Sequence, residues 1–210
     1  MKGHSTHRYR RPSGMLRFAF TGLLSVSPVL SASAMTCSTP SANDADASCS
    51  LPLKNGDFSQ FRRVGSTRAV RWSRLAYWTV SHPQHNLGAQ YDGLWGAELF
   101  AADHHMSQRV PLAPTAGATR FEVSFAAGAF GDANGQLVVG LVLTDATGKP
   151  VRSHGVTIRP PSSGWDRHKV SMHVSDVTEG SQLKIVFKRQ GHAGGRQLVV
   201  ADVRADQIVE

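Results

Sequence analysis

The feature that most constrains the fold is a period of two in apolar residues, repeated in short segments. Phe121, Val123 and Phe125 alternate with polar neighbours, which is the pattern of a β-strand with one buried face. Residues 169–174 and 183–187 alternate again, and residues 198–209 close the chain as another strand-like segment. Residues 136–143 form a nearly continuous apolar run, which predicts a strand buried on both faces.

Turn signals separate these segments. Clusters of Gly, Pro, Asn, Asp and Ser stand at residues 131–135, 145–150, 160–164 and 191–195. No stretch of twelve residues after residue 50 keeps the apolar stripe of a helix. Many short strands at nearly even spacing predict an all-β fold, a jelly-roll β-sandwich, over residues 51–210.

The first 34 residues have the composition of a secretory signal peptide. Five cations and no acidic residue precede or flank an apolar run over residues 18–30, and Ala32-Ser33-Ala34 supplies a small-residue cleavage site. The run is too short to span a bilayer. We therefore expect residues 1–34 to be removed and the protein to be secreted or periplasmic. A start at Met15 would leave a more compact signal, and both starts stay open.

The leader also explains most of the positive charge. The formal net charge is +8, and removal of the five leader cations lowers it to about +3, so the charge does not indicate a nucleic-acid partner. A local excess remains at Arg62, Arg63, Arg68, Arg71 and Arg74. Such a run is typical of a solvated strand face, and the alternative is contact with an anionic polysaccharide or cell-surface component.

Residues 35–50 are rich in Ser, Thr, Ala, Asp and Pro, which predicts a flexible linker. Both cysteines, Cys37 and Cys49, lie in it. Two cysteines in an exported chain predict a disulfide bond, and a lipid anchor on Cys37 is the alternative. Because the pair precedes the main strands, its loss is expected to leave the fold intact.

The order of several motifs resembles carbohydrate-binding modules of the galactose-binding-like jelly-roll type, which are appended to bacterial cellulases and xylanases. The resemblance covers residues 51–209 and rests on the following segments: Asn55-Gly56-Asp57-Phe58-Ser59, Trp72 or Trp78 in a strand, Gln108-Arg109-Val110, residues 121–127, Gly164-Trp165 and Ala201-Asp202-Val203. It implies a secreted, non-catalytic protein that binds a poly- or oligosaccharide.

The same resemblance raises the question of a structural calcium ion. Members of the family often hold one with an acidic residue where this chain has Ser59 and another where it has Ala201. Calcium requires six to eight oxygen ligands. Asp57 and Asp202 are thus only weak calcium candidates, and no cofactor is expected.

Sugar binding requires aromatic rings for the C–H faces and planar polar groups for the hydroxyls. Residues 72–103 hold this mixture. The predicted ligand-binding residues are Trp72, Trp78, Tyr91 and Trp95, with the polar side chains of Gln90, Asp92 and Arg109. The alternative for each tryptophan is a place in the core of the sandwich, and Trp165 is assigned to structure.

Enzymatic motifs are absent from the sequence. It has no Gly-x-Ser-x-Gly elbow, no His-Glu-x-x-His and no phosphate-binding loop. Glycoside hydrolysis would require two carboxylates from Asp92, Glu98 and Asp103. A β-sandwich polysaccharide lyase would recruit Tyr91, His104 or Arg109. Adjacent strand residues point to opposite faces, so His104 and His105 are not expected to share a metal ion. A secreted protein that binds another protein is the remaining alternative.

Overall fold

The computed structural model describes residues 47–64, 71–81, 88–130, 135–191 and 197–210, with the backbone alone at 47, 61–64, 71–74 and 89. The chain divides into two units, residues 1–33 and residues 34–210. The predicted signal peptide and Cys37 lie outside the described residues. None of the described segments is a helix long and apolar enough to cross a membrane.

Thirteen strands are described, in the order in which the chain forms them: β1 (Ala47–Ser50), β2 (Phe61–Val64), β3 (Arg71–Leu75), β4 (Thr79–Val80), β5 (Gly88–Tyr91), β6 (Leu94–Leu99), β7 (His105–Pro111), β8 (Thr119–Phe130), β9 (Gln136–Thr144), β10 (Pro150–Ile158), β11 (Asp166–Val174), β12 (Gln182–Gln190) and β13 (Gln197–Val209).

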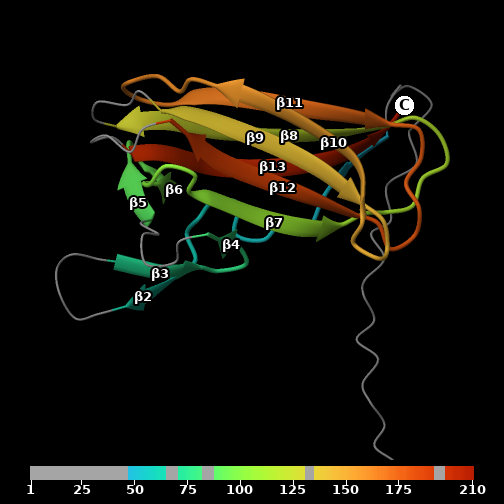
Figure 1. Cartoon of the computed structure of the whole chain (residues 1–210), viewed down its shortest axis with the longest axis horizontal. Coiled ribbons are helices and arrows are strands. Elements are labelled where there is room, and N and C mark those ends of the chain that lie inside the picture. The colour runs from blue at the N-terminus through green and yellow to red at the C-terminus, as the bar shows by residue number, and fades with distance from the viewer. Residues whose placement is uncertain (1–46, 65–70, 82–87, 131–134, 192–196) are drawn as a thin grey trace, which may run out of the picture. The chain divides into compact units, whose positions relative to one another are not determined.

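Two large antiparallel sheets and a separate two-stranded sheet of β2 and β3 make up the domain (Figure 1). Sheet I has the order β11-β8-β13-β6-β5, with β1 paired to β13, and sheet II has the order β10-β9-β12-β7-β4. The last eight strands pair as nested hairpins, in which β9 pairs with β10, β8 with β11, β7 with β12 and β6 with β13. A long hairpin folded over itself in this way is a jelly roll. The predicted all-β, jelly-roll fold is confirmed.

The core lies between the inner faces of the two sheets. Phe121, Val123 and Phe125 of β8 are buried, as their alternation predicted, and the ring of Phe125 meets that of Phe187 of β12 edge-on at 5.0 Å. Burying side chains of this size stabilises the fold by about 1.5–3 kcal/mol each. The alternating apolar residues thus form the core that holds the two sheets together.

Two predictions about elements are wrong in part. Strand β9 is buried on one face only, because Leu137, Val139 and Leu141 face the core while Val138 and Val142 are partly exposed on the outer face of sheet II. Residues 47–50 of the predicted linker form β1, which pairs with the end of β13. The domain therefore starts before residue 51.

The segment after β1 is held by a buried asparagine. Asn55 donates from Nδ2 to the carbonyls of Gln60 and Ala76 and accepts from the amide of Gln60. A Cβ on Gly56 would lie 2.2 Å from the carbonyl oxygen of Val203, so only glycine fits there. The Asn-Gly motif therefore joins the start of the domain to β13.

Candidate functional site

Trp78, one of the predicted ligand-binding aromatics, is a core residue instead. Its side chain is 5% exposed and packs on Phe58 and Phe187, with ring centroids 5.3 and 6.1 Å away. Its Nε1 donates to the carbonyl of Asn55 at 3.1 Å. A ring covered in this way offers no face to a sugar, so Trp78 leaves the set of candidates.

Trp72 lies in β3, where its Cα is paired with that of Arg63 in β2. Its side chain lies outside the described residues, as do the side chains of Arg62, Arg71 and Arg74 and the whole of Arg68. The binding role of Trp72 and the partner of the arginine cluster stay predictions.

The β5–β6 hairpin brings four predicted residues together. Its turn, Asp92-Gly93, has φ angles of 45° and 82°, the left-handed pair that a type I′ turn requires and that Asp-Gly supplies. Gln90 and Trp95 are register partners across the hairpin. Gln90 and Asp92 are exposed, whereas Tyr91 and Trp95 are half-buried.

Tyr91 belongs to an aromatic cluster on the outer face of sheet I. Its ring stacks on Phe130 with centroids 4.1 Å apart and meets the edge of Trp165 at 6.5 Å. Trp165 Nε1 donates to the carbonyl of Tyr91 at 3.1 Å, in agreement with the structural role assigned to Trp165. Because one ring face of Tyr91 lies on Phe130, this residue shapes the base of the hairpin.

The hydroxyl of Tyr91 lies against a buried carboxyl group. It hydrogen-bonds to Oε1 of Glu98 and lies 2.6 Å from Oε1 of Gln197. Burial raises the pKa of Glu98 to about 7, against the lowering effect of the Tyr91 hydrogen bond. Burial and then Glu98 raise the pKa of Tyr91 as well, so the phenol keeps its proton.

The proton positions follow from this geometry. A phenol has a single proton and cannot donate to Glu98 and Gln197 at once. Tyr91 donates to Oε1 of Glu98 when that carboxyl group is ionised. When Glu98 is protonated, it can donate to Tyr91, and Tyr91 can then donate to Gln197 without a buried charge. The cluster is therefore neutral when Glu98 holds its proton.

A cleft of about 400 Å³ lies beside the hairpin. Four chain segments meet there: the loop after β1, the β5–β6 hairpin, the start of β11 and the middle of β13. We call it the hairpin cleft, and its lining residues are Asp57, Gly93, Leu94, Trp95, Arg167, Asp202 and Arg204. Three of the residues predicted from sequence, Trp95, Asp57 and Asp202, thus come together in one place.

A β-bulge places the central carboxylate of this cleft. Ala201 and Arg204 of β13 pair with Ala126 and Ser124 of β8, so β13 has an extra residue here. Asp202 lies in the bulge with a φ of 45°, a conformation that Asp tolerates better than most residues.

Two guanidinium groups hold this carboxylate. Arg167 Nη2 lies 2.8 Å from its Oδ2 and Arg204 Nη2 lies 3.2 Å from its Oδ1. Burial raises the pKa of Asp202, but the two arginines outweigh burial and hold that pKa below its usual range. Asp202 is therefore ionised.

These contacts do not fit the calcium ion that the resemblance left open. Both oxygens of Asp202 already bind arginine, and two cations at this distance repel a third. Asp57 accepts from the amide of Ser59 at 3.2 Å. Within the described ranges no group of three or more His, Cys, Asp or Glu side chains is arranged to hold a metal ion. Asp57 and Asp202 are thus better explained as acceptors in the cleft.

Arg109, also predicted to bind ligand, lies on the other sheet. It is an exposed residue of β7, paired with Lys184 of β12. The structure therefore does not bring it to the hairpin. His104 and His105 separate as expected, because His104 is fully buried and accepts from the amide of Phe100, whereas His105 is exposed.

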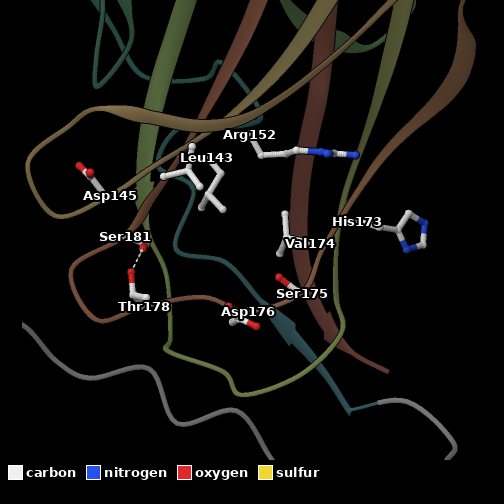
Figure 2. A pocket seen from close by; sticks show the side chains of 10 residues that line it. Leu143, Asp145, Arg152, His173, Val174, Ser175, Asp176, Thr178 and Ser181 are labelled. Carbon is white, nitrogen blue, oxygen red and sulfur yellow. Dashed lines mark hydrogen bonds between the residues drawn. The ribbon is translucent and has the colours of Figure 1, made fainter.

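A second cavity, of about 640 Å³, opens at the end of the sandwich where β9, β10 and β11 meet. Figure 2 shows Leu143 and Val174 at its centre and Arg152 extending across it. Asp145, at its rim, accepts from the amides of Thr147 and Lys149 in its own turn. Its lining residues include no Phe, Tyr or Trp: Leu143, Asp145, Val151, Arg152, His173, Val174, Ser175, Asp176, Thr178 and Ser181. It therefore lacks the large aromatic ring that we expect at a site for a neutral sugar.

Two cleft residues, Arg167 and Arg204, were missed from the sequence. Arg167 was missed because it reaches Asp202 only when β11, β8 and β13 follow one another in sheet I, and Arg204 because its neighbour Asp202 was read only as a weak calcium candidate. The one available signal was their position next to Trp165 and Asp202 in motifs of the resemblance.

Comparison with known proteins gives no relative by sequence. No protein-family profile and no curated protein matches the chain. Among solved structures, the chain is similar to a module, TmCBM61, determined in complex with β-1,4-galactotriose, at 23% identity over 74% of this chain and 97% of that one, with a TM-score of 0.38.

Other similar structures include the family 11 carbohydrate-binding module of the cellulase Lic26A-Cel5E of Clostridium thermocellum, at 12% identity, 73% and 91% coverage and a TM-score of 0.39. The enzymatically active domain of tailspike protein 4 of bacteriophage CBA120 is similar at 14% identity over 74% of this chain, with a TM-score of 0.48, and this chain spans 21% of it. The function has to be inferred from the residues of this chain.

Proposed function

We propose that this chain binds carbohydrate without cleaving it and that the hairpin cleft is its binding site. The observation that carries the proposal is the convergence of Trp95, Arg167, Arg204, Asp57 and Asp202 from four separate chain segments.

The chemistry of these side chains suits a sugar. The indole of Trp95 supplies an apolar surface for C–H groups. The guanidinium groups are planar donors and the carboxylates are acceptors, as pairs of neighbouring hydroxyls require. The volume of about 400 Å³ falls within the range of about 300–1,000 Å³ that is usual for ligand sites.

The charges in the cleft favour a neutral sugar. Arg167 and Arg204 oppose Asp57 and Asp202, so the formal charges of the lining balance. The arginine side chains are 67% and 70% exposed while they contact Asp202. Their N–H groups that do not contact Asp202 are the donors that we assign to sugar hydroxyls.

Protonation states favour binding over hydrolysis. A glycosidase needs one carboxyl group that keeps its proton and acts as general acid. The arginines hold the pKa of Asp202 low, so it does not fill this role. Glu98 has the raised pKa, but its carboxyl group is buried against Tyr91 and does not line the cleft.

We further propose that the protein acts outside the cytoplasm, because residues 1–34 have the composition of a signal peptide. Mass spectrometry of the secreted protein is expected to find an N-terminus near Met35. Recovery of a cytoplasmic product with an intact leader would contradict this.

The cleft is tested by replacing its exposed arginines. We expect Arg167→Gln and Arg204→Gln each to weaken glycan binding about tenfold, since a hydrogen bond to a charged group contributes about 1.5–3 kcal/mol. The Tm is expected to change little, because exposed ion pairs contribute about 0–1 kcal/mol. A glycan array finds the ligand, and calorimetry then compares the variants.

The matched control is Arg159→Gln, which removes an exposed arginine after β10. Equal losses in the control and the cleft variants, or no bound glycan on the array, would contradict the proposal. Shorter saccharides released from a bound polysaccharide would show that the protein is an enzyme.

A further inference from the structure

The outer face of sheet II is an ordered array of side chains. The buried positions of β9 and β12 face the core, so the residues between them face outward, and register places them in rows across the strands. We call this surface the open face. Its three rows, read from β10 to β7, are Ser153-Val142-Lys184-Arg109, Gly155-Gly140-Val186-Ser107 and Thr157-Val138-Lys188-His105.

The central row is a shallow track of small residues. A Cβ built on Gly140 would meet nothing closer than Val186 at 3.7 Å, and one on Gly155 nothing closer than the Val139 carbonyl at 3.7 Å. Both positions thus have room for a larger residue. The row crosses four strands, and strands are about 4.8 Å apart, so an extended molecule on it spans about 14 Å.

The first row carries two cations side by side. Lys184 and Arg109 are register partners on β12 and β7, and like charges directly opposite each other in a sheet destabilise it. No ion pair of either residue occurs within the described ranges. In the third row, by contrast, Lys188 pairs with Asp103 at 2.9 Å. Unbalanced positive charge is therefore concentrated on one side of the track.

On sheet I, by contrast, the cations of the outer face are paired with carboxylates. On its outer face Arg120 and Lys169 pair with Glu122, and Arg167 and Arg204 pair with Asp202. The twelve outward positions of the open face contain no acidic residue. Among the described side chains of the two large sheets, the unpaired like-charge pair is thus a property of this face.

We propose that the open face binds an acidic polysaccharide that runs across the strands. Lys184 and Arg109 bind its carboxylate or sulfate groups, the Gly-Val track contacts its sugar rings, and the exposed Ser153 and Thr157 bind its hydroxyls. This site lies on the opposite sheet from the hairpin cleft and does not depend on it.

Other anionic partners fit this face less well. Single-stranded nucleic acid stacks its bases on aromatic rings, and a membrane surface is entered by large apolar side chains. The twelve positions of the open face include no Phe, Tyr, Trp or large apolar side chain, and their one ring is the imidazole of His105. An acidic polysaccharide is held here by ion pairs with Lys184 and Arg109 and by hydroxyl groups, and not by the ring stacking that we assign to the hairpin cleft.

The probes that test the proposal are polygalacturonate, dextran sulfate and uncharged dextran, immobilised for biolayer measurements on the whole protein. We expect binding to at least one acidic polymer and weaker binding as salt rises, because salt screens exposed charges. Binding to polygalacturonate alone identifies carboxylate as the ligand group, and binding to dextran sulfate alone identifies sulfate. Both results support the proposal.

The variants are Lys184→Gln, Arg109→Gln and the double variant. Each single change is expected to weaken binding about tenfold and to leave the Tm unchanged or slightly raised, since it removes a repulsion. The matched control is Lys169→Gln, which removes one cation from sheet I. Arg167→Gln and Arg204→Gln are expected to leave this binding unchanged, which separates the two sites.

Three results would overturn the proposal. One is a double variant that binds acidic polymers as tightly as the unchanged protein, or no more weakly than the Lys169→Gln control. Another is equally tight binding to polygalacturonate, dextran sulfate and uncharged dextran. The last concerns phosphatidylglycerol vesicles and single-stranded DNA. If the protein binds either as tightly as it binds the acidic polysaccharides, and the same variants abolish that binding, the face is a general anion-binding surface.

Discussion

At the scale of single residues, Glu98 shows how burial changes the pKa of a carboxyl group. Its side chain is 4% exposed, and its Oε2 has no hydrogen-bond partner among the described residues. Burial raises its pKa from 4.5 to about 7. The folded state thus binds a proton that the unfolded chain releases between these two pH values.

We predict that Glu98 makes stability fall as pH rises. The contribution is fully present below about pH 4.5, declines through the interval up to pH 7 and is absent above it. The linkage amounts to about 3 kcal/mol. Glu98→Gln mimics the protonated acid and is expected to flatten this part of the curve.

Urea denaturation between pH 4 and pH 8 measures this effect. Glu179→Gln, an exposed change of the same kind, serves as the control and should keep the slope of the unchanged protein. A Glu98→Gln variant with the same slope as the control would contradict the prediction.

Trp78 and Trp95 differ in a way that one pair of variants can show. Trp78→Ala removes a core ring and is expected to cost about 3–5 kcal/mol of stability, with ligand lost only when the fold is lost. Trp95→Ala, at a half-buried cleft position, is expected to weaken glycan binding while the protein stays folded. Thermal melting and binding are measured on both. A Trp78→Ala variant that melts near the unchanged protein would contradict its core role.

At the scale of elements, the strand pattern was a reliable guide where one face alternates. The alternation of Phe121, Val123 and Phe125 predicted β8 correctly, because each apolar residue faces the core. In β9 the run of apolar residues predicted burial on both faces, but nothing among the described residues covers Val138 and Val142 completely. Outward valines on an open sheet face are the kind of surface that a ligand covers.

Strand β1 shows how local composition misleads. Its sequence, Ala47-Ser48-Cys49-Ser50, reads as linker, yet pairing with the end of β13 makes it a strand. The described part of the chain holds no free cysteine, and Cys49 is 8% exposed. The Cys37–Cys49 disulfide stays a prediction, because Cys37 lies outside the described residues. A bond there would tether the N-terminal segment to sheet I.

At the scale of the whole molecule, the two sheets are joined by a buried arginine as well as by apolar packing. Arg189 of β12 is fully buried. Its Nη1 donates to the carbonyls of Leu99 and Phe100, at the end of β6, at 3.0 Å each. It thus links sheet II to sheet I at one edge of the sandwich.

We predict that Arg189→Met destabilises the domain by on the order of 3 kcal/mol, because two buried carbonyls lose a charged donor. Its neighbour Lys188 is partly exposed and forms one surface ion pair. Lys188→Met is therefore the control, with an expected cost of about 1 kcal/mol or less. Urea denaturation compares them, and equal costs would show that Arg189 is not the link inferred here.

The sequence by itself determined the fold class, because a period of two and regular turn signals are local properties of the chain. It also identified residues that gather at the β5–β6 hairpin, since Gln90, Tyr91, Asp92 and Trp95 are close in sequence and Asp-Gly specifies the turn between them. The sequence did not show which of the predicted aromatic residues is buried, because burial depends on contacts with residues distant in sequence. Trp78 is buried because Phe58 and Phe187 pack on it, and neither contact is visible in the residues next to Trp78 in sequence.

The tertiary structure alone decided where charges meet. Arg167 comes beside Asp202 because β11, β8 and β13 follow one another in sheet I, and Lys184 faces Arg109 because β12 pairs with β7. These two pairs join residues 35 and 75 positions apart. Their separation is set by strand order and register, and a single sequence does not encode either in any local pattern.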